Sequence, residues 1–364
     1  MGGQALGGTG RVHSATDLVD SAGGGLDPEA LGFFGRTPLI TVAVDDDPAL
    51  DRFVELARHL PCVVVGVAAG SVGGTAPPDL DLLLTTEAHP PRPWVSTTDL
   101  AGELDELTGA VARSPLAVVA LVQLLRFSPA LSTADALVAE SFVYSMLQSS
   151  PHHVAWLEDH PRQARPVVEG VVSVERLGTV LSVTLDRAPV RNAYSAQMRD
   201  ELVAALQLAA ADPSIERVTL GGAGPAFCSG GDLDEFGTTP DAAEAHVVRV
   251  TRSAGWWLDR LSDRVTVTVH GACVGAGVEL PAFAGHVEAR SGARFSLPEV
   301  AMGLVPGAGG TASIPRRIGR QRTVYLAVTG RPIDVDTALE WGLVDDVIDA
   351  VVDGAAEPGT RARG

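Results

Sequence analysis

Lysine is absent from this chain of 364 residues, so its 27 basic residues are all arginines. They are outnumbered by 45 acidic residues, which gives a formal net charge of −18. An acidic chain repels the phosphates of nucleic acids unless arginines gather in a local patch, and the sequence has no such patch. We therefore expect no nucleic-acid partner.

Cysteine is also rare. Cys62, Cys228 and Cys273 lie far apart, and none of them belongs to a CxxC pair. This spacing argues against both a disulfide framework and a zinc site, and it fits a reducing compartment. We expect no metal centre.

Long apolar runs are missing as well. The longest uncharged stretch, residues 61–78, is interrupted by Gly70, Gly73, Gly74 and Pro77. The first residues do not combine a basic segment with an apolar one, as a secretory signal would. These absences argue against a membrane span and against secretion, so we expect a cytoplasmic protein without membrane attachment.

Aromatic residues make up only 5% of the chain, whereas hydrophobic residues as a whole reach 46%. Such a composition can bury a sizeable core, built mainly from Ala, Val and Leu. The 40 glycines and 24 prolines predict many tight turns between the elements.

Patterning divides the chain into four parts. Residues 1–36 hold ten glycines without periodicity, which predicts a flexible Gly-rich leader. Residues 37–166 form an α/β and helical unit, in which the region 99–159 has helical spacing of apolar residues. Prolines near residue 166 mark a boundary, a second domain covers 167–350, and residues 351–364 form a tail.

Strands and helices alternate in the second domain. The sequence predicts a β-hairpin from residues 171–177 and 180–186, and a helix over 195–211 capped by Ser195. Further elements are expected as strands at 218–221 and 265–269, a helix around 242–261, and a helix entered by Val278. This alternation favours a layered α/β architecture.

Two strand-to-helix junctions are rich in glycine. The first is GPAFCSGGDL over residues 224–233, and the second is HGACVGAGVEL over residues 270–280. Glycine lets the main chain approach a ligand closely, and the first N–H groups of a helix lack partners within it. Two adjacent junctions can direct two N–H groups at one oxygen, as in an oxyanion hole. Either junction alone is more often an ordinary turn.

Together with FSLPEVAMGLVPGAGGT at residues 295–311, these junctions resemble the crotonase (enoyl-CoA hydratase/isomerase) superfamily. Matching pieces also occur at residues 185–193, 329–334 and 338–345, so the resemblance covers about residues 170–349. It implies an α/β fold with a crotonase-like (ClpP/crotonase) ββα spiral core, preceded here by a degenerate α/β-helical unit.

The resemblance also implies roles for individual residues. The backbone N–H groups of Ser229 and Ala276 would form the oxyanion hole for a thioester carbonyl, and Glu279 and Glu299 would be the two catalytic carboxylates. The family holds coenzyme A through the loop that here consists of Ser229, Gly230, Gly231 and Asp232, with Ala276 beside it. Coenzyme A would be part of the substrate, with no separate cofactor, and the chain would form a homo-oligomer, either a trimer or a hexamer.

Hydration of a 2-enoyl thioester needs one carboxylate that takes a proton from water and another that supplies one to the α-carbon. Glu279 falls in the first turn of its predicted helix, where the helix dipole favours the ionised form, so we assign it as the base and Glu299 as the acid. The leading interpretation is an enoyl-CoA hydratase. Alternatives are another crotonase-type reaction (isomerase, thioesterase or arylacetyl-CoA oxygenase) and a non-catalytic subunit that binds coenzyme A or supports assembly.

Four further residues have two interpretations each. Arg187 and Arg191 could contact the phosphates of coenzyme A or could be solvated surface charges. Trp256 and Trp257 could line the acyl pocket or pack in the core.

The cysteines and a histidine pair have simpler interpretations. Cys228 and Cys273 neighbour the junctions without a His or an acid beside them, so we expect small buried residues and not nucleophiles. His152 and His153 lack a third ligand, so a helix-end pair is the better interpretation than a metal site.

The chain departs from the family at two places. Ala276 stands where hydratases usually have Gly, and the segment after residue 349 is shorter than the helical tail of the family. Residues 100–160 resemble that tail in order and spacing. We therefore hypothesise that residues 37–166 are a degenerate crotonase unit whose helices 100–160 pack on the second domain in place of the tail.

Overall fold

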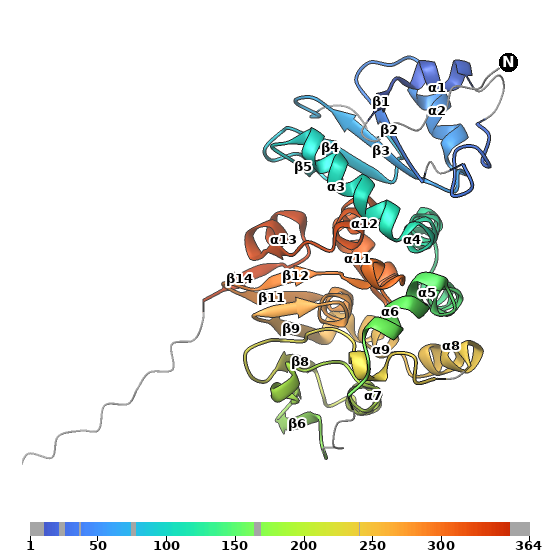
Figure 1. Ribbon diagram of the computed structural model, residues 1–364. Helices are drawn as coiled ribbons and strands as arrows, with labels where there is room; N and C mark the ends of the chain where they lie inside the picture. The colour runs from blue at the N-terminus through green and yellow to red at the C-terminus, as the bar shows by residue number, and fades with distance from the viewer. Residues whose placement is uncertain are drawn as a thin grey trace, which may run out of the picture.

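The computed structural model describes residues 11–21, 26–35, 38–73, 78–163, 169–239 and 241–349. Two β-sheets with mainly parallel strands lie at different levels of the molecule, with helices α11 (Gly310–Ile318) and α12 (Arg320–Thr329) between them (Figure 1). The sheet nearer the N-terminus is at the top of the figure, and the larger sheet is below it.

The larger sheet has six strands in the order β14-β11-β9-β8-β7-β6. The expected hairpin is confirmed, because β6 and β7 pair antiparallel, while all the other pairs in this sheet are parallel. A small sheet of β10, β12 and β13 adjoins it. The strands are β6 (Val172–Leu177), β7 (Val180–Leu185), β8 (Arg217–Gly222), β9 (Val265–Val269), β10 (Ala272–Val274), β11 (His286–Arg290), β12 (Arg294–Ser296), β13 (Ile333–Asp334) and β14 (Asp346–Ile348).

The helices of this part agree only partly with expectation. Helix α7 (Ala196–Ala211) is capped by Ser195 as predicted. The single helix expected at 242–261 is wrong: Ser253 accepts the N–H of Trp256 and starts a new helix, which divides the segment into α8 (Ala242–Thr251) and α9 (Ala254–Arg260). Helix α10 (Ala276–Glu279) is a single turn, and α13 (Val335–Trp341) follows α12.

The first sheet contains five parallel strands in sequence order, β1 (Val12–His13), β2 (Leu39–Ala43), β3 (Val63–Ala68), β4 (Leu82–Thr85) and β5 (Val95–Ser96), with helices α1 (Ala15–Ser21) and α2 (Leu50–Ala57) between strands. The flexible leader expected at residues 1–36 is therefore wrong for residues 12–21. Strand β1 pairs with Thr41 and Val42, and Ala15 and Leu18 of α1 are buried. A two-residue strand and one buried helical turn carry too little periodicity to be recognised among glycines. Residues 1–10, 22–25 and 36 of the expected leader, like the expected tail 351–364, lie outside the described residues.

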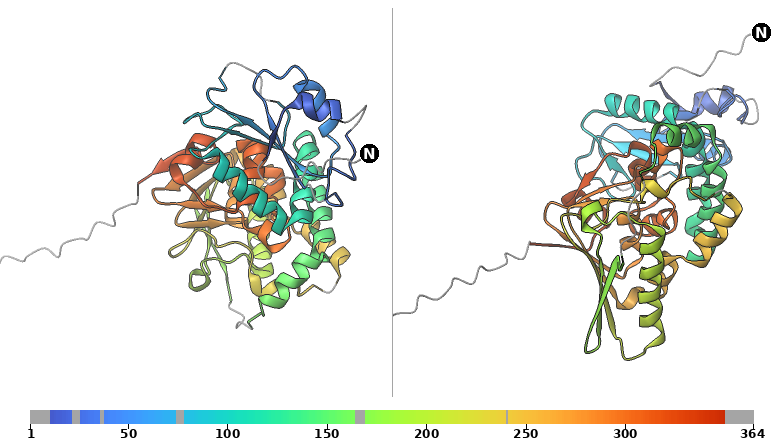
Figure 2. Two further views of the ribbon diagram at one scale, coloured as in Figure 1. Left: turned by 45° about the horizontal axis from the view of Figure 1, so that its top comes forward. Right: turned by 60° about the horizontal axis from the view of Figure 1, so that its bottom comes forward.

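Four helices run from the first sheet down one side of the molecule (Figures 1 and 2): α3 (Leu100–Arg113), α4 (Pro115–Phe127), α5 (Thr133–Gln148) and α6 (Pro151–Asp159). Helices α3 and α4 contact α12, and α5 contacts α8 and α11. Residues 100–160 are thus attached to the second domain, while their descent from a crotonase tail stays a hypothesis. Among the described residues, no single helix is long and apolar enough to cross a membrane; α3 and the segment Pro115–Ala130 qualify only as a pair, which is bent by 105°.

One hydrophobic core joins the two halves of the chain. It includes Val65 of β3, Leu121 of α4, Val267 of β9 and Leu326 of α12, so the boundary expected near residue 167 does not separate two cores. A smaller cluster, with Phe53 and other residues, covers the opposite face of the first sheet. Because both faces of β3 are covered, its run of apolar residues is continuous.

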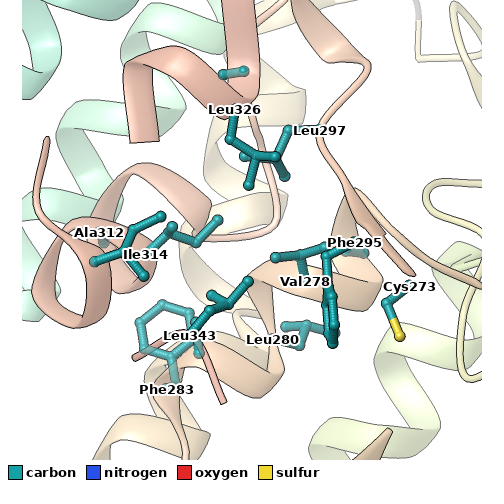
Figure 3. Packing of buried hydrophobic residues seen from close by; sticks show 14 of the residues in the cluster. Cys273, Val278, Leu280, Phe283, Phe295, Leu297, Ala312, Ile314, Leu326 and Leu343 are labelled. Carbon is teal, nitrogen blue, oxygen red and sulfur yellow. The ribbon is translucent and has the colours of Figure 1, made fainter. Parts of the chain in front are cut away.

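Helix α10 is anchored in the larger cluster. Figure 3 shows Val278 and Leu280 beside Phe295 of β12, and all three are buried. Packing on this side fixes α10 against the small sheet, so that the opposite side of the turn can face a cavity.

Candidate active site

A cavity of about 180 Å³ lies where α5, α7, α8 and α10 meet the loop that precedes α11. Three carboxylates line it: Glu279 at the end of α10, Glu299 in the 3-10 turn Glu299–Met302, and Glu140 of α5. The structure thus brings the two predicted carboxylates together and adds a third that comes from the first half of the chain.

A glycine permits the close approach of the Glu299 carboxylate to the main chain before α10. Gly275, directly before α10, has a φ of +49°, a conformation that L-residues with a side chain rarely adopt. A Cβ atom at this position would collide with the carboxylate of Glu299. The glycine is therefore needed for both the turn and the space.

Glu279 and Glu140 share the start of α11. Glu279 accepts the N–H groups of Ala308 (2.7 Å) and Gly310 (2.8 Å). Glu140 accepts those of Gly309 (2.8 Å) and Thr311 (2.8 Å), together with the Thr311 hydroxyl (2.7 Å). Consecutive amides at a helix N-terminus thus alternate between two carboxylates, which satisfies donors that have no partner within the helix.

The amides that favour the ionised form of Glu279 come from a helix other than the expected one. We expected its own helix to favour the charged form, but Glu279 is the last residue of the four-residue helix α10. The donors belong instead to the start of α11, which is distant in sequence.

Burial raises the pKa of all three carboxyls. It raises the pKa of Glu279 to about 7 and that of Glu140 to about 8, while the hydrogen bonds from α11 act in the opposite direction. The pKa of Glu299 lies well above its usual range because of burial and of the nearby Glu279 charge. Oε2 of Glu299 is enclosed and has no hydrogen-bond partner among the residues that the structure describes. Of the two predicted carboxylates, Glu279 is the easier to ionise, because it accepts two backbone N–H groups.

The two glycine-rich junctions lie side by side. The backbones of Cys228 and Cys273 pair as an isolated parallel β-bridge, and the N–H of Val274 donates to the carbonyl of Cys228 at 3.0 Å. Ala276 of the second junction and Gly231 of the first both line the cavity. The main chain of the two junctions can therefore face one ligand.

The first junction presents a different residue from the one expected. The N–H of Ser229 donates to the carbonyl of Arg191 at 2.9 Å, and Ser229 does not line the cavity, so its assignment as an oxyanion donor is wrong. Gly230, with a φ of +94°, turns the chain, and the next residue, Gly231, faces the cavity. Among the described residues, neither the Gly231 N–H nor the Ala276 N–H has an acceptor.

Asp232 and Arg187 are engaged with each other. The Asp232 carboxylate is buried and lies 2.5 Å from Nη1 of Arg187, which also donates to the carbonyl of Ala193 at 3.1 Å. Arg187 is therefore an internal partner of Asp232 and not a solvated surface charge. The expected contacts of coenzyme A with Gly230, Asp232 and Arg191 stay predictions.

The two tryptophans do not line the cavity, so the acyl-pocket interpretation is wrong for both. Trp257 packs against the core, and the ring of Trp256 lies 4.7 Å from the guanidinium of Arg260. The helix break at Ser253 is the reason, because it brings Ser253 and Ala254 to the cavity instead.

Cys228 and Cys273 are buried and do not line the cavity, in agreement with the expected packing role. Burial raises the pKa of Cys228 to about 12, which keeps its thiol protonated. His152 and His153 lie at the start of α6, where Nδ1 of His153 is 2.9 Å from the carbonyl of Met302. Within the described ranges, no group of three or more His, Cys, Asp or Glu side chains could hold a metal ion.

Sequence reasoning missed the contribution of α5. Leu137, Glu140, Ser141 and Tyr144 all line the cavity, and their spacing of three, four and seven residues places them on one face of the helix. The signal that could have identified these cavity residues is the combination of an acid, a serine and a tyrosine on a helix face that also carries a leucine.

Comparisons with known proteins identify the family of the second half of the chain. The family model described as enoyl-CoA hydratase/isomerase matches residues 175–356. A mevalonyl-coenzyme A hydratase of Beauveria bassiana is 35% identical over 177 residues, which cover 46% of this chain and 63% of that protein. A 2,3-dehydroadipyl-CoA hydratase of Escherichia coli is 35% identical (48% of this chain, 68% of that protein), and a 1,2-epoxyphenylacetyl-CoA isomerase of the same organism is 33% identical (47% and 66%).

Proposed function

Because this chain belongs to the enoyl-CoA hydratase/isomerase family and has its crotonase fold, we propose that it hydrates a 2-enoyl-CoA thioester. One observation carries the proposal: Glu279 and Glu299 line the same cavity as Ala276 and Gly231, whose N–H groups have no acceptor among the described residues. An acid, a base and an oxyanion site are the groups that this addition requires.

The reaction begins with the thioester carbonyl oxygen at the N–H groups of Gly231 and Ala276. Ionised Glu279 takes a proton from water as the water oxygen bonds to the β-carbon, and the electrons of the double bond move toward the carbonyl. The two N–H groups stabilise the resulting enolate-like charge, at about 3 kcal/mol for a well-placed donor. Protonated Glu299 then gives its proton to the α-carbon. A proton returns from Glu279 to Glu299 through solvent and restores both groups.

The surroundings of the two acids support this division of roles. Glu279 accepts two backbone N–H groups, which favours its charged form. Oε2 of Glu299 is buried near Glu279 and has no partner within the described part of the chain, which favours a neutral carboxyl with a proton to give.

The test uses trans-2-butenoyl-CoA and longer 2-enoyl-CoA thioesters, with loss of the enoyl-thioester absorbance as the signal and mass spectrometry to detect added water. We expect Glu279→Gln and Glu299→Gln each to lower kcat by about 100-fold or more, with unchanged circular dichroism. Wild-type rates in both variants, or binding of coenzyme A thioesters without any turnover, would contradict the proposal.

Isomerisation is distinguished in the same experiment. A 3-enoyl-CoA thioester gains absorbance when its double bond moves into conjugation, and the mass of the product does not change. Activity with this substrate but none with 2-enoyl thioesters would assign an isomerase.

A further inference from the structure

Three arginines line the active-site cavity of this strongly acidic chain: Arg199 of α7, Arg249 of α8 and Arg252 after α8. Asp200 pairs with two of them, at 2.8 Å from Arg199 and 2.5 Å from Arg252. Arg249 has no carboxylate in salt-bridge contact within the part of the chain that the structure describes. The arginine group therefore carries more positive charge than its own acid neutralises.

Neutral groups hold Arg249 in place. Its Nε donates to the Ser141 hydroxyl (3.0 Å) and its Nη2 to the Ser141 carbonyl (3.3 Å), while other contacts go to the Ser145 hydroxyl and to Oε1 of Gln148 (3.4 Å). The guanidinium also lies 4.7 Å from the centre of the Tyr144 ring. Burial lowers the pKa of Arg249, while its charge interactions with Tyr144 and Glu140 act in the opposite direction. A half-buried, rigidly held cation of this kind favours an anionic ligand.

Helix α5 links this cation to the reacting groups. Glu140, which neighbours Glu279 at the start of α11, and Tyr144, which lies under Arg249, are four residues apart on the cavity-lining face. At the rise of an α-helix, this separation is about 6 Å along the axis. The α- and β-carbons of a bound enoyl chain would be near the acids, so the next few carbons would reach Arg249.

The ionisation of the acids leaves room for a second negative charge. Burial and the charge of Glu279 raise the pKa values of Glu140 and Glu299, which favours the neutral form of both when Glu279 is charged. The cavity then holds one carboxylate and three guanidinium groups, which Asp200 only partly neutralises.

We propose, on the premise that the enzyme hydrates enoyl-CoA thioesters, that its substrate has a short acyl chain ending in a carboxylate, which binds Arg249. The substrate class is thus the mono-CoA thioesters of unsaturated dicarboxylic acids. Arg249 contacts the far end of the chain and determines specificity, whereas the Glu pair acts on the double bond.

Matched pairs of substrates test this directly. Wild-type kcat/KM is compared between 2-hexenedioyl mono-CoA and 2-hexenoyl-CoA, and between 2-pentenedioyl mono-CoA and 2-pentenoyl-CoA. We expect the dicarboxylic member of at least one pair to be favoured about tenfold or more, the effect of one charge-assisted hydrogen bond in a half-buried site. A preference for the uncharged member in both pairs would overturn the proposal without any variant.

Substitutions then locate the preference. Arg249→Gln should lower kcat/KM for the dicarboxylic substrate and remove most of the preference, while Arg249→Lys should keep part of it. Arg176→Gln, which removes an exposed arginine of the β6 strand, controls for the change in net charge and should leave the preference intact. An Arg249→Gln enzyme that folds and keeps the wild-type preference would refute the role of Arg249.

Binding measurements separate this proposal from the proposed function and from a role in binding phosphate. Calorimetry with coenzyme A, hexanoyl-CoA and the mono-CoA thioester of hexanedioic acid requires no turnover. If only the last ligand loses affinity in Arg249→Gln, the acyl carboxylate is the partner, even should hydration fail. Equal losses for all three ligands would assign Arg249 to the phosphates of coenzyme A and overturn the proposal.

Discussion

Glu140 is the residue that changes the chemistry of the site most, because its carboxylate and that of Glu279 accept alternate amides at the start of α11. Glu140 does not have to touch the substrate to matter. Its hydrogen bonds to Gly309 and Thr311 fix the loop whose neighbouring amides hold Glu279. It is therefore a positioning residue for the proposed base.

The protonation of this pair sets an expected pH dependence. Glu279 must be charged to accept a proton, and its pKa is raised to about 7, so kcat/KM should fall as the pH drops through about 7 and not near the usual range of a glutamate. The Glu279 charge favours the neutral form of Glu140, so Glu140→Gln should leave this limb near pH 7 and should lower kcat, because an amide cannot accept the N–H groups of Gly309 and Thr311 with both of its terminal atoms. The groups that face the pair are Glu299, Tyr144, Tyr194 and Arg249.

A matched control distinguishes this effect from general damage. Glu103 is also buried but pairs with Arg331 away from the cavity. Glu103→Gln can lower the Tm, yet it should leave kcat unchanged. If Glu140→Gln keeps the wild-type kcat, the positioning role of Glu140 is refuted. A shift of the limb to lower pH would show instead that Glu140 is charged while Glu279 titrates.

Local motifs explain which residues the sequence could identify. Glu279 and Glu299 each lie inside a short, recognisable segment, so the sequence predicts both, and the structure places both at the cavity. The sequence predicts Ser229 and not Gly231 as the N–H donor, because the direction of this N–H group depends on the pairing of Tyr194 with Gly231, which no local pattern encodes. Glu140 was missed because its partner amides are about 170 residues away.

At the scale of elements, Asp81 joins three parts of the structure. Its buried carboxylate accepts the N–H of Val64 in β3 (2.9 Å), Nε (2.9 Å) and Nη2 (2.6 Å) of Arg126 in α4, and Nη1 of Arg320 in α12 (3.3 Å). Arg126 also donates to the carbonyl of Leu60 at 2.7 Å. This network holds strand β3 of the first sheet to helices α4 and α12.

We expect Asp81→Asn to lower the free energy of unfolding by about 3 kcal/mol or more, because the change leaves the mostly buried Arg126 without its anion. Asp79→Asn is the control: Asp79 also pairs with Arg320, but its side chain is 51% exposed, so the cost should stay below about 1 kcal/mol. Denaturation in guanidinium chloride measures both. Equal costs would show that burial does not determine the strength of this network.

Elements with a strong period were predictable, and interrupted ones were not. The hairpin β6–β7 and the capped helices α5 and α7 follow the pattern of their apolar residues and caps. The break between α8 and α9 depends on a serine cap inside a helical pattern, and β1 has only two residues. In both cases the local sequence signal is weak, and packing against the rest of the molecule determines the secondary structure.

For the whole molecule, the first half of the chain contributes directly to the site of the second. Helix α5 supplies Glu140, Ser141 and Tyr144 to the cavity, and one core includes residues of β3, α4, β9 and α12. The family motifs lie only in the second half, so the sequence could identify the fold of that half but not the contacts that join the two.

This shared core predicts that the chain unfolds in a single transition. The fluorescence of Trp94, which is buried at the first sheet, should change at the same denaturant concentration as enoyl-CoA turnover and circular dichroism. The contribution of Trp94 is obtained as the difference between the wild type and Trp94→Phe. Asp81→Asn should move all three midpoints together to lower denaturant, because weakening the first sheet also releases α4 and α5. Turnover that persists after the Trp94 signal has changed would show that the second half holds its active site without the first.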